Sequence, residues 1–184
     1  YWYPSYKKSI KPSALSLFKQ LGYDINIYTT TSLKYAKMNQ YIFTDVIDNI
    51  YKFDGYGASV GNPMVKRSEL YKYDEMMVDK FSTELINSDS DKPSLSYFLF
   101  YSTHYNYYFP EQFAKFEPYI KRYYHIYEKD LQEQTELIFN RYKNSAHYAD
   151  HLINKIIDII TINEQLDNTI IVVVGDHGEA FNEF

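Results

Sequence analysis

The sequence contains no cysteine, and its 184 residues include one tryptophan, six glycines and six prolines. Without cysteine the chain forms no disulfide and offers neither a thiolate nucleophile nor a cysteine zinc site. Long hydrophobic runs are also absent, since no apolar stretch approaches the length of a membrane-spanning helix. Positive charge is in deficit, because 24 acidic residues outnumber 19 basic ones and give a net charge of −5. This balance provides no electrostatic basis for nucleic acid as the main partner.

Apolar and aromatic residues are abundant. Apolar residues make up 45% of the chain, a fraction that excludes a disordered protein, and the length suits one domain with a sizeable core. The 22 tyrosines and 12 phenylalanines are suited to a sugar or lipid-headgroup site. A general bias towards Tyr, Ile, Asn and Lys explains the same numbers without any such site.

Hydrophobic periodicity predicts alternating helices and strands. The spacing indicates helices at 14–21, 66–86 and 130–164, a short helix at 45–52, and strands at 23–29, 95–102 and 169–175. The glycine-rich stretch 54–63 has neither a Walker lysine nor a strong preceding strand, and we interpret it as a loop. Strands that alternate with helices predict right-handed crossovers, and therefore an α/β fold with a parallel sheet flanked by helices.

The most informative stretch is the end of the last predicted strand. Ile170 to Val174 are five consecutive β-branched residues, a pattern typical of a strand buried on both faces. Asp176 and His177 follow at once, between Gly175 and Gly178. Ligands of open α/β sheets bind beyond the carboxyl ends of the strands, and adjacent oxygen and nitrogen donors suit a divalent metal ion. A polar glycine-rich turn without a ligand is the alternative interpretation.

His104 occupies the equivalent place after the strand at 95–102. We expect it at the same edge of the sheet as Asp176 and His177, because parallel strands end on one side. An imidazole there can hydrogen-bond an oxygen of a phosphate or sulfate, or give a proton to a leaving alkoxide. The predicted helix at 130–164 carries an apolar stripe at Tyr142, Ala146, Ala149, Ile153, Ile156 and Ile160. By contrast, the helical pair His147 and His151 points away from this stripe, so we expect both to face solvent.

The motif Val174-Gly175-Asp176-His177-Gly178-Glu179 resembles the C-terminal metal motif of the sulfatase branch of the alkaline phosphatase superfamily. With Ala180 to Glu183 attached, it is similar to the membrane-anchored, sulfatase-like proteins of bacterial envelopes. These include lipoteichoic acid synthases, phosphoethanolamine transferases and the inner-membrane regulator YejM. The resemblance implies an alkaline-phosphatase-like fold in which Asp176 and His177 bind a divalent ion, namely Mg²⁺, Mn²⁺, Zn²⁺ or Ca²⁺. It also implies that His104 contacts the substrate, although Asn106 stands where the family usually has proline.

The same resemblance implies that residues 1–184 are part of a larger catalytic domain. The family's nucleophile and an acidic ligand precede the region matched here, and a further histidine segment follows it. We therefore expect no catalytic nucleophile within the fragment, and no activity from the fragment alone. The parent is expected to be a metal-dependent hydrolase or transferase acting on phosphate or sulfate esters of envelope lipids or glycans. An upstream anchor would hold it at the extracytoplasmic face of a bacterial inner membrane, with the fragment itself soluble.

Two other functions remain open on the sequence. The similarity to a regulator favours a pseudoenzyme, in which the fold is kept as a lipid-sensing or protein-interaction module at the membrane. A cytosolic metalloenzyme of the phosphoglycerate mutase branch also carries Asp-His pairs. The residue at the nucleophile position separates the first alternative from an enzyme, and an upstream membrane segment excludes the second.

Overall fold

The computed structural model describes residues 13–34, 38, 46–53, 66–88, 91–125 and 128–181. Its helices are α1 (Ala14–Gln20), α3 (Tyr71–Ile86) and α4 (Thr135–Ile162), and its strands are β1 (Asp24–Thr29), β2 (Asn49–Lys52) and β3 (Ser94–Leu99). Short 3₁₀ turns lie at Arg67–Glu69, Glu111–Phe113, Lys129–Gln134 and Leu166–Asn168. Among these helices, none combines the length and the apolar composition needed to cross a bilayer. The predicted loop at 54–63 lies outside the described residues.

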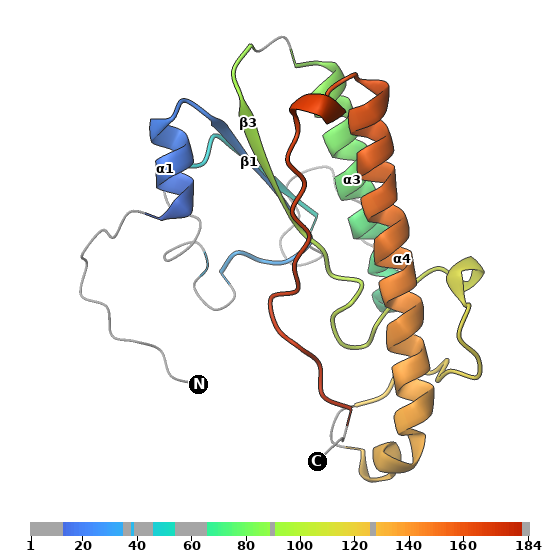
Figure 1. Ribbon diagram of the computed structural model, residues 1–184. Helices are drawn as coiled ribbons and strands as arrows, with labels where there is room; N and C mark the ends of the chain where they lie inside the picture. Colours follow the sequence, from blue (N-terminus) through green and yellow to red (C-terminus); the bar gives the residue numbers. More distant parts are fainter. Residues whose placement is uncertain are drawn as a thin grey trace, which may run out of the picture.

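The three strands form a parallel sheet in the order β2-β1-β3 (Figure 1). The boundaries of α1, which precedes β1, follow from local sequence. Ser13 caps α1 by accepting a hydrogen bond from the Ser16 amide at 3.1 Å, and Gly22 takes the left-handed conformation (φ +86°) that ends the helix. The predicted helix at 14–21 and strand at 23–29 are therefore confirmed within one residue.

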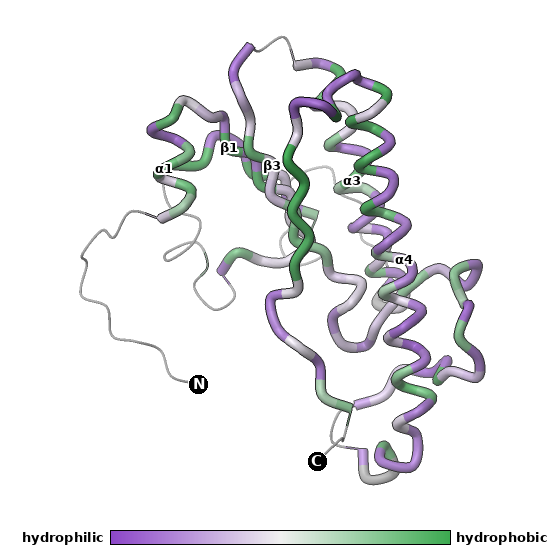
Figure 2. The backbone as a smooth tube through the Cα atoms, viewed as in Figure 1, coloured by the Kyte–Doolittle hydropathy of each residue, from purple (hydrophilic) through white to green (hydrophobic). Residues whose placement is uncertain are grey.

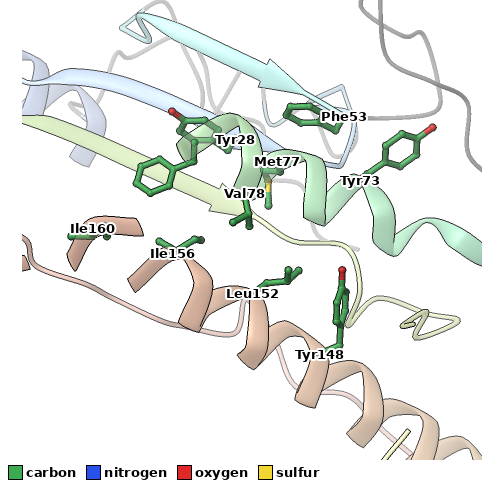
Figure 3. Close-up of a cluster of buried hydrophobic side chains, with 10 residues drawn as sticks. Tyr28, Phe53, Tyr73, Met77, Val78, Tyr148, Leu152, Ile156 and Ile160 are labelled. Carbon is green, nitrogen blue, oxygen red and sulfur yellow. The ribbon is translucent and has the colours of Figure 1, made fainter. Parts of the chain in front are cut away.

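Helices cover both faces of the sheet, as predicted (Figure 1). On one face, Leu15 of α1 packs against Ile25 and Ile27, both fully buried. On the other face, Tyr28 packs against the layer formed by α3 and α4. Figure 3 shows this core, with residues of both helices gathered beside the sheet; its buried members include Tyr73, Met77, Val78, Phe81, Tyr148, Leu152, Ile156 and Ile160.

The predicted short helix at 45–52 is wrong, because Asn49–Lys52 is strand β2. The physical reason is pairing: Asn49 to Lys52 lie in parallel register with Asn26 to Thr29 of β1. A neighbouring strand supplies backbone partners that a helical periodicity cannot anticipate over so few residues.

The segment at 169–175 is also not the predicted central strand. It is extended but unpaired among the described residues, and its apolar side chains are exposed, with Ile170 at 92% and Val174 at 81%. Figure 2 shows this hydrophobic run passing in front of the sheet, not within it. A strand requires hydrogen-bond partners on a neighbour, and the described backbone provides none for these residues.

Over the first half of α4, the buried face is rotated about the helix axis relative to the predicted apolar stripe. The stripe was expected at Tyr142, Ala146, Ala149, Ile153, Ile156 and Ile160, whereas the buried positions are Ile138, Asn140, Arg141, Asn144, Ser145, Tyr148, Leu152, Ile156 and Ile160. An apolar pattern alone does not predict this face, because four polar side chains of the helix are buried with specific partners. Asn144, for example, accepts from the amides of Lys115 and Phe116, both at 2.8 Å, and donates to the Phe116 carbonyl at 3.0 Å.

Candidate functional site

The carboxyl ends of β1 and β3 are joined by a buried carboxylate that the sequence analysis did not single out. Asp74 of α3 is fully buried and accepts from Thr30 Oγ1 at 2.9 Å, just beyond β1. It also accepts from the amide of Tyr101 at 2.9 Å and from the amide of Ser102 at 2.8 Å, just beyond β3. Burial raises the pKa of the Asp74 carboxyl, and the hydrogen bonds from Ser102, Tyr101 and Thr30 oppose that shift. Asp74 thereby fixes the start of the loop that carries His104.

A sequence signal for Asp74 did exist. It lies four residues after Leu70 and three before Met77, on the face of α3 that the apolar spacing assigns to the core. A carboxylate at such a position needs several donors, because a buried charge without them is strongly unfavourable.

His104 lies in the turn after β3, and its side chain is exposed. Its amide donates to the Tyr101 carbonyl at 2.8 Å, and its ring stacks on the Tyr101 ring with centroids 4.8 Å apart. Its Nδ1 lies 2.8 Å from the Tyr105 carbonyl oxygen. A carbonyl only accepts, so Nδ1 carries the hydrogen and Nε2 is left to accept from, or when protonated donate to, a ligand.

Asn106, the departure from the family pattern, has a structural role. Its side chain is 2% exposed, and its Oδ1 accepts from the Tyr124 amide at 3.3 Å. The amide therefore ties the His104 loop to the segment near Tyr124, while His104 remains accessible.

Asp176 and His177 have a geometry that fits two ligands of one metal ion. His177 Nδ1 lies 2.7 Å from the Gly178 carbonyl oxygen, so in the neutral ring Nε2 carries the lone pair. Histidine ligands commonly donate their second ring N–H in this way. His177 Nε2 is 3.7 Å from Asp176 Oδ2, and two ligand bonds of about 2.1 Å each span up to roughly 4 Å. Both side chains are exposed, at 68% for His177 and 81% for Asp176.

The same contacts also affect the proton affinity of His177. Its hydrogen bond to the Gly178 carbonyl, followed by the negative charge of Asp176, raises the pKa of the His177 imidazole. The carboxylate of Asp176 thus favours positive charge on the neighbouring imidazole.

An aromatic cluster brings the motif and the His104 loop together. Phe181 packs against Tyr142 with ring centroids 5.1 Å apart, against Phe139 at 5.0 Å and against Tyr107 at 6.1 Å. Tyr107 belongs to the His104 loop and is buried. Burial, followed by the negative charge of Glu179, raises the pKa of the Tyr107 hydroxyl. The two segments are therefore neighbours through Tyr107, Glu179 and Phe181.

The predicted site residues themselves are not gathered into one cluster. Within the described part of the chain, His104 shares no hydrogen bond, ion pair or ring contact with Asp176 or His177. The described residues also contain no group of three or more His, Asp or Glu side chains able to hold a metal ion. The metal role of Asp176 and His177 and the substrate role of His104 remain predictions.

The two histidines of α4, His147 and His151, differ in exposure. His151 is exposed, as predicted, whereas His147 is half-buried. The Phe113 ring contacts both, with centroids 5.9 Å away for His147 and 4.8 Å for His151. His147 Nδ1 is 3.4 Å from the Phe113 carbonyl oxygen. The pair packs against an aromatic ring, and the described residues bring no third metal ligand to it.

The parallel sheet with helices on both faces, and an acid-histidine pair beyond an apolar run, define an α/β protein of the alkaline-phosphatase-like type. The family model described as Sulfatase matches residues 3–184, and the chain belongs to that family.

Relatives of known sequence and structure agree with this assignment. The chain is 25% identical over 170 residues to the Kdo(2)-lipid A phosphoethanolamine 7''-transferase of Escherichia coli (strain K12), covering 91% of this chain and 26% of that protein. Its fold is similar to the C-terminal periplasmic domain of EcEptC from Escherichia coli in complex with Zn, with a TM-score of 0.56 and 20% identity over 83% of this chain and 39% of that one. A second structure of that domain gives a TM-score of 0.54 and 19% identity, with the same coverage. The chain thus spans well under half the length of these relatives.

Proposed function

We propose that this chain contributes to a metal-dependent transferase or hydrolase domain that acts on phosphate or sulfate esters of envelope lipids or glycans. The observation that carries the proposal is the pairing of Asp176 Oδ2 and His177 Nε2 at 3.7 Å, in a chain that belongs to the Sulfatase family. The relative named as a phosphoethanolamine transferase favours transfer to a lipid acceptor, and the relative named as a Zn complex favours a divalent ion. Because the latter is a periplasmic domain, it also favours the extracytoplasmic side of an inner membrane.

In this proposal Asp176 and His177 hold the ion, which would supply positive charge to neutralise an ester oxygen and lower the pKa of the nucleophile. His104 presents Nε2 to the same ester. There it hydrogen-bonds a non-bridging oxygen, or protonates the leaving alkoxide when the ring is charged. Asp74 holds the loop that carries His104, so it positions this group without touching the ester.

The proposal assigns residues 1–184 to part of the catalytic domain. Two protein ligands do not fill the coordination shell of a divalent ion, so a functional site needs further ligands and a nucleophile from elsewhere in a longer chain. We therefore expect this chain alone to bind metal weakly and to turn over no ester. A membrane anchor outside residues 1–184 belongs to the same proposal.

The test compares this chain with one extended at both ends to the length of its relatives. Calorimetric titration of Zn²⁺, Mn²⁺ and Mg²⁺ should show tighter binding by the extended chain. The substitution Asp176→Asn should weaken binding at least tenfold, because it removes a full negative charge from the ion's immediate surroundings. Asp167→Asn is the matched control, since Asp167 is an exposed carboxylate before the same run and should not affect binding.

Activity is measured alongside with an aryl phosphate and an aryl sulfate. In the extended chain, His104→Gln should lower turnover while the metal affinity stays unchanged. Absence of metal binding by the extended chain, or equal binding by Asp176→Asn, would overturn the enzyme proposal. The catalytically inactive module with a regulatory or lipid-sensing role would then take its place.

A further inference from the structure

A hollow of about 390 Å³ lies beside the loop that follows His104. Its lining includes Ser68, Tyr108, Glu111, Tyr119, Lys121 and Arg141. Its size falls within the range of small-molecule sites, roughly 300–1,000 Å³, and its walls are mainly aromatic. Neither His104 nor the pair Asp176 and His177 lines it, so it is distinct from the candidate metal site.

Of the charged residues in its wall, Arg141 of α4 is the buried one, at 5% exposed. Arg141 Nη1 donates to the carbonyls of Ile120 at 2.9 Å and Arg122 at 2.7 Å, and Nε donates to the Tyr107 carbonyl at 3.4 Å. All three acceptors are neutral. Within the described residues no carboxylate forms an ion pair with this guanidinium, and burial lowers the pKa of Arg141. A buried cation without a counter-charge is unfavourable unless something compensates it.

Aromatic faces supply part of that compensation. Arg141 Cζ lies 5.2 Å from the centroid of the Tyr108 ring and 5.9 Å from that of Tyr124, within the range of cation–π contacts. Neither ring offers a full negative charge, and the guanidinium therefore keeps the capacity to bind an anion.

One nitrogen of Arg141 makes no hydrogen bond among the described residues. Nε and Nη1 make the hydrogen bonds given above, and Nη2 donates none among the described residues. The Tyr124 hydroxyl is the one described side-chain atom that is both sealed from solvent and without a partner. Nη2 is therefore accessible to solvent, and Arg141 is one of the residues that line the hollow.

We propose that this hollow binds the anionic group of a sugar ligand, a phosphate or a carboxylate, through the Arg141 guanidinium. A guanidinium forms strong charge-assisted hydrogen bonds to both kinds of group, and tyrosine rings offer flat apolar faces with polar edges for a sugar ring. The negative charge of Glu111 is offset by its ion pair with Lys121 at 2.9 Å, and its carboxylate also accepts from the Tyr119 hydroxyl at 2.6 Å. The proposal adds a second binding site and does not depend on the metal site.

Calorimetry with EDTA present tests this binding separately from any metal chemistry. The probes are glucose 1-phosphate, glucuronate, inorganic phosphate and glucose. We expect at least one charged sugar to bind at least tenfold more tightly than glucose. A preference for glucose 1-phosphate assigns the anion as phosphate, and a preference for glucuronate assigns it as carboxylate. Weaker binding of inorganic phosphate than of the favoured sugar measures the contribution of the aromatic wall.

Two variants should impair binding at this site in different ways. Arg141→Lys keeps the charge but loses the planar fork, and it should weaken the favoured sugar at least tenfold. Ser68→Trp fills the hollow from an exposed position without removing any bond of Arg141, and it should have a similar effect. Lys143→Gln is the control: it removes a cation from the same helix that contacts the Phe116 and Phe139 rings and does not line the hollow.

Circular dichroism establishes whether each variant is folded. If Arg141→Lys does not fold, sugar binding by Ser68→Trp alone tests the proposal. The proposal is overturned if no charged probe binds, if glucose binds as tightly as the charged sugars, or if the folded variants bind as the wild type does. If the extended chain binds no metal while this chain binds the charged sugar, the proposed function fails and the proposed sugar site stands.

Discussion

Asp74 and Arg141 are both buried charged residues on helices, but their surroundings differ. Asp74 accepts hydrogen bonds from two amides and two hydroxyls, which belong to Thr30, Tyr101 and Ser102. Arg141 donates to neutral carbonyls alone and lines a hollow. The first arrangement is complete within the chain and stabilises the fold, whereas the second is incomplete and suits a ligand.

Replacing Asp74 tests the stabilising role. Asp74→Asn exchanges one acceptor oxygen for a donor, which then faces amides that can only donate. We expect the free energy of unfolding to fall by about 1–3 kcal/mol at neutral pH, the usual cost of unsatisfied buried groups. Chemical denaturation followed by circular dichroism measures it. Asp79→Asn, on the same helix but with a side chain 71% exposed, should change stability by less than about 0.5 kcal/mol. Equal effects of the two substitutions would contradict this account of Asp74.

At the scale of elements, the carboxylate of Asp48, which lies just before β2, joins helix α1 to strand β1. Asp48 Oδ2 accepts from Lys19 Nζ of α1 at 2.7 Å and from the Ile25 amide of β1 at 2.8 Å. These partners, the Ile25 amide first and the Lys19 side chain second, lower the pKa of Asp48 below its ordinary value of 3.8. Asp48 therefore stabilises the packing of α1 on the sheet while it is ionised.

The pH dependence of that contribution has a definite sign. A lowered pKa in the folded state means that the contribution is fully present above pH 3.8 and is lost as the pH falls through the folded-state pKa. Asp48→Asn should cost about 1 kcal/mol at pH 7, since the ion pair is partly exposed and screened. The difference in unfolding free energy from wild type should shrink steadily below pH 4, as measured by urea denaturation at several pH values. A difference that grew on acidification would refute this role of Asp48.

At the scale of the whole molecule, the sheet is covered on both faces while the most hydrophobic run of the chain stays outside it (Figures 1 and 2). The apolar side chains at 170–174 are therefore not part of the core of this chain. Phe181 instead provides the contact that holds the end of this segment against the body of the protein.

Paired substitutions test this placement. Val172→Thr and Val174→Thr, at side chains 75% and 81% exposed, should each change the free energy of unfolding by less than about 0.5 kcal/mol. Ile27→Thr, at a fully buried position of β1, should cost about 2–3 kcal/mol because it places a hydroxyl in the core. Amide hydrogen exchange should be fast at 170–174 and slow in β1. Destabilisation by the valine substitutions comparable to that of Ile27→Thr would show that the run is buried in solution.

The sequence by itself determined the features that depend on neighbouring residues. The cap and glycine around α1, the alternation in β1, the apolar spacing of α3, the parallel α/β class and the Asp176-His177 motif after an apolar run all follow from local pattern and family resemblance. Each rests on side chains a few positions apart, whose preferences act on the same short piece of backbone.

The tertiary structure alone decided what depends on residues far apart in the chain. Asn49–Lys52 is a strand because β1 provides its ladder, whereas the run at 170–174 is unpaired because no described strand provides one. The inner face of α4 follows the partners of Arg141 and Asn144, which lie about 20 to 35 residues away. The roles of Asp74 and Arg141 also depend on the tertiary structure, because the groups around a buried charge in space set its free energy.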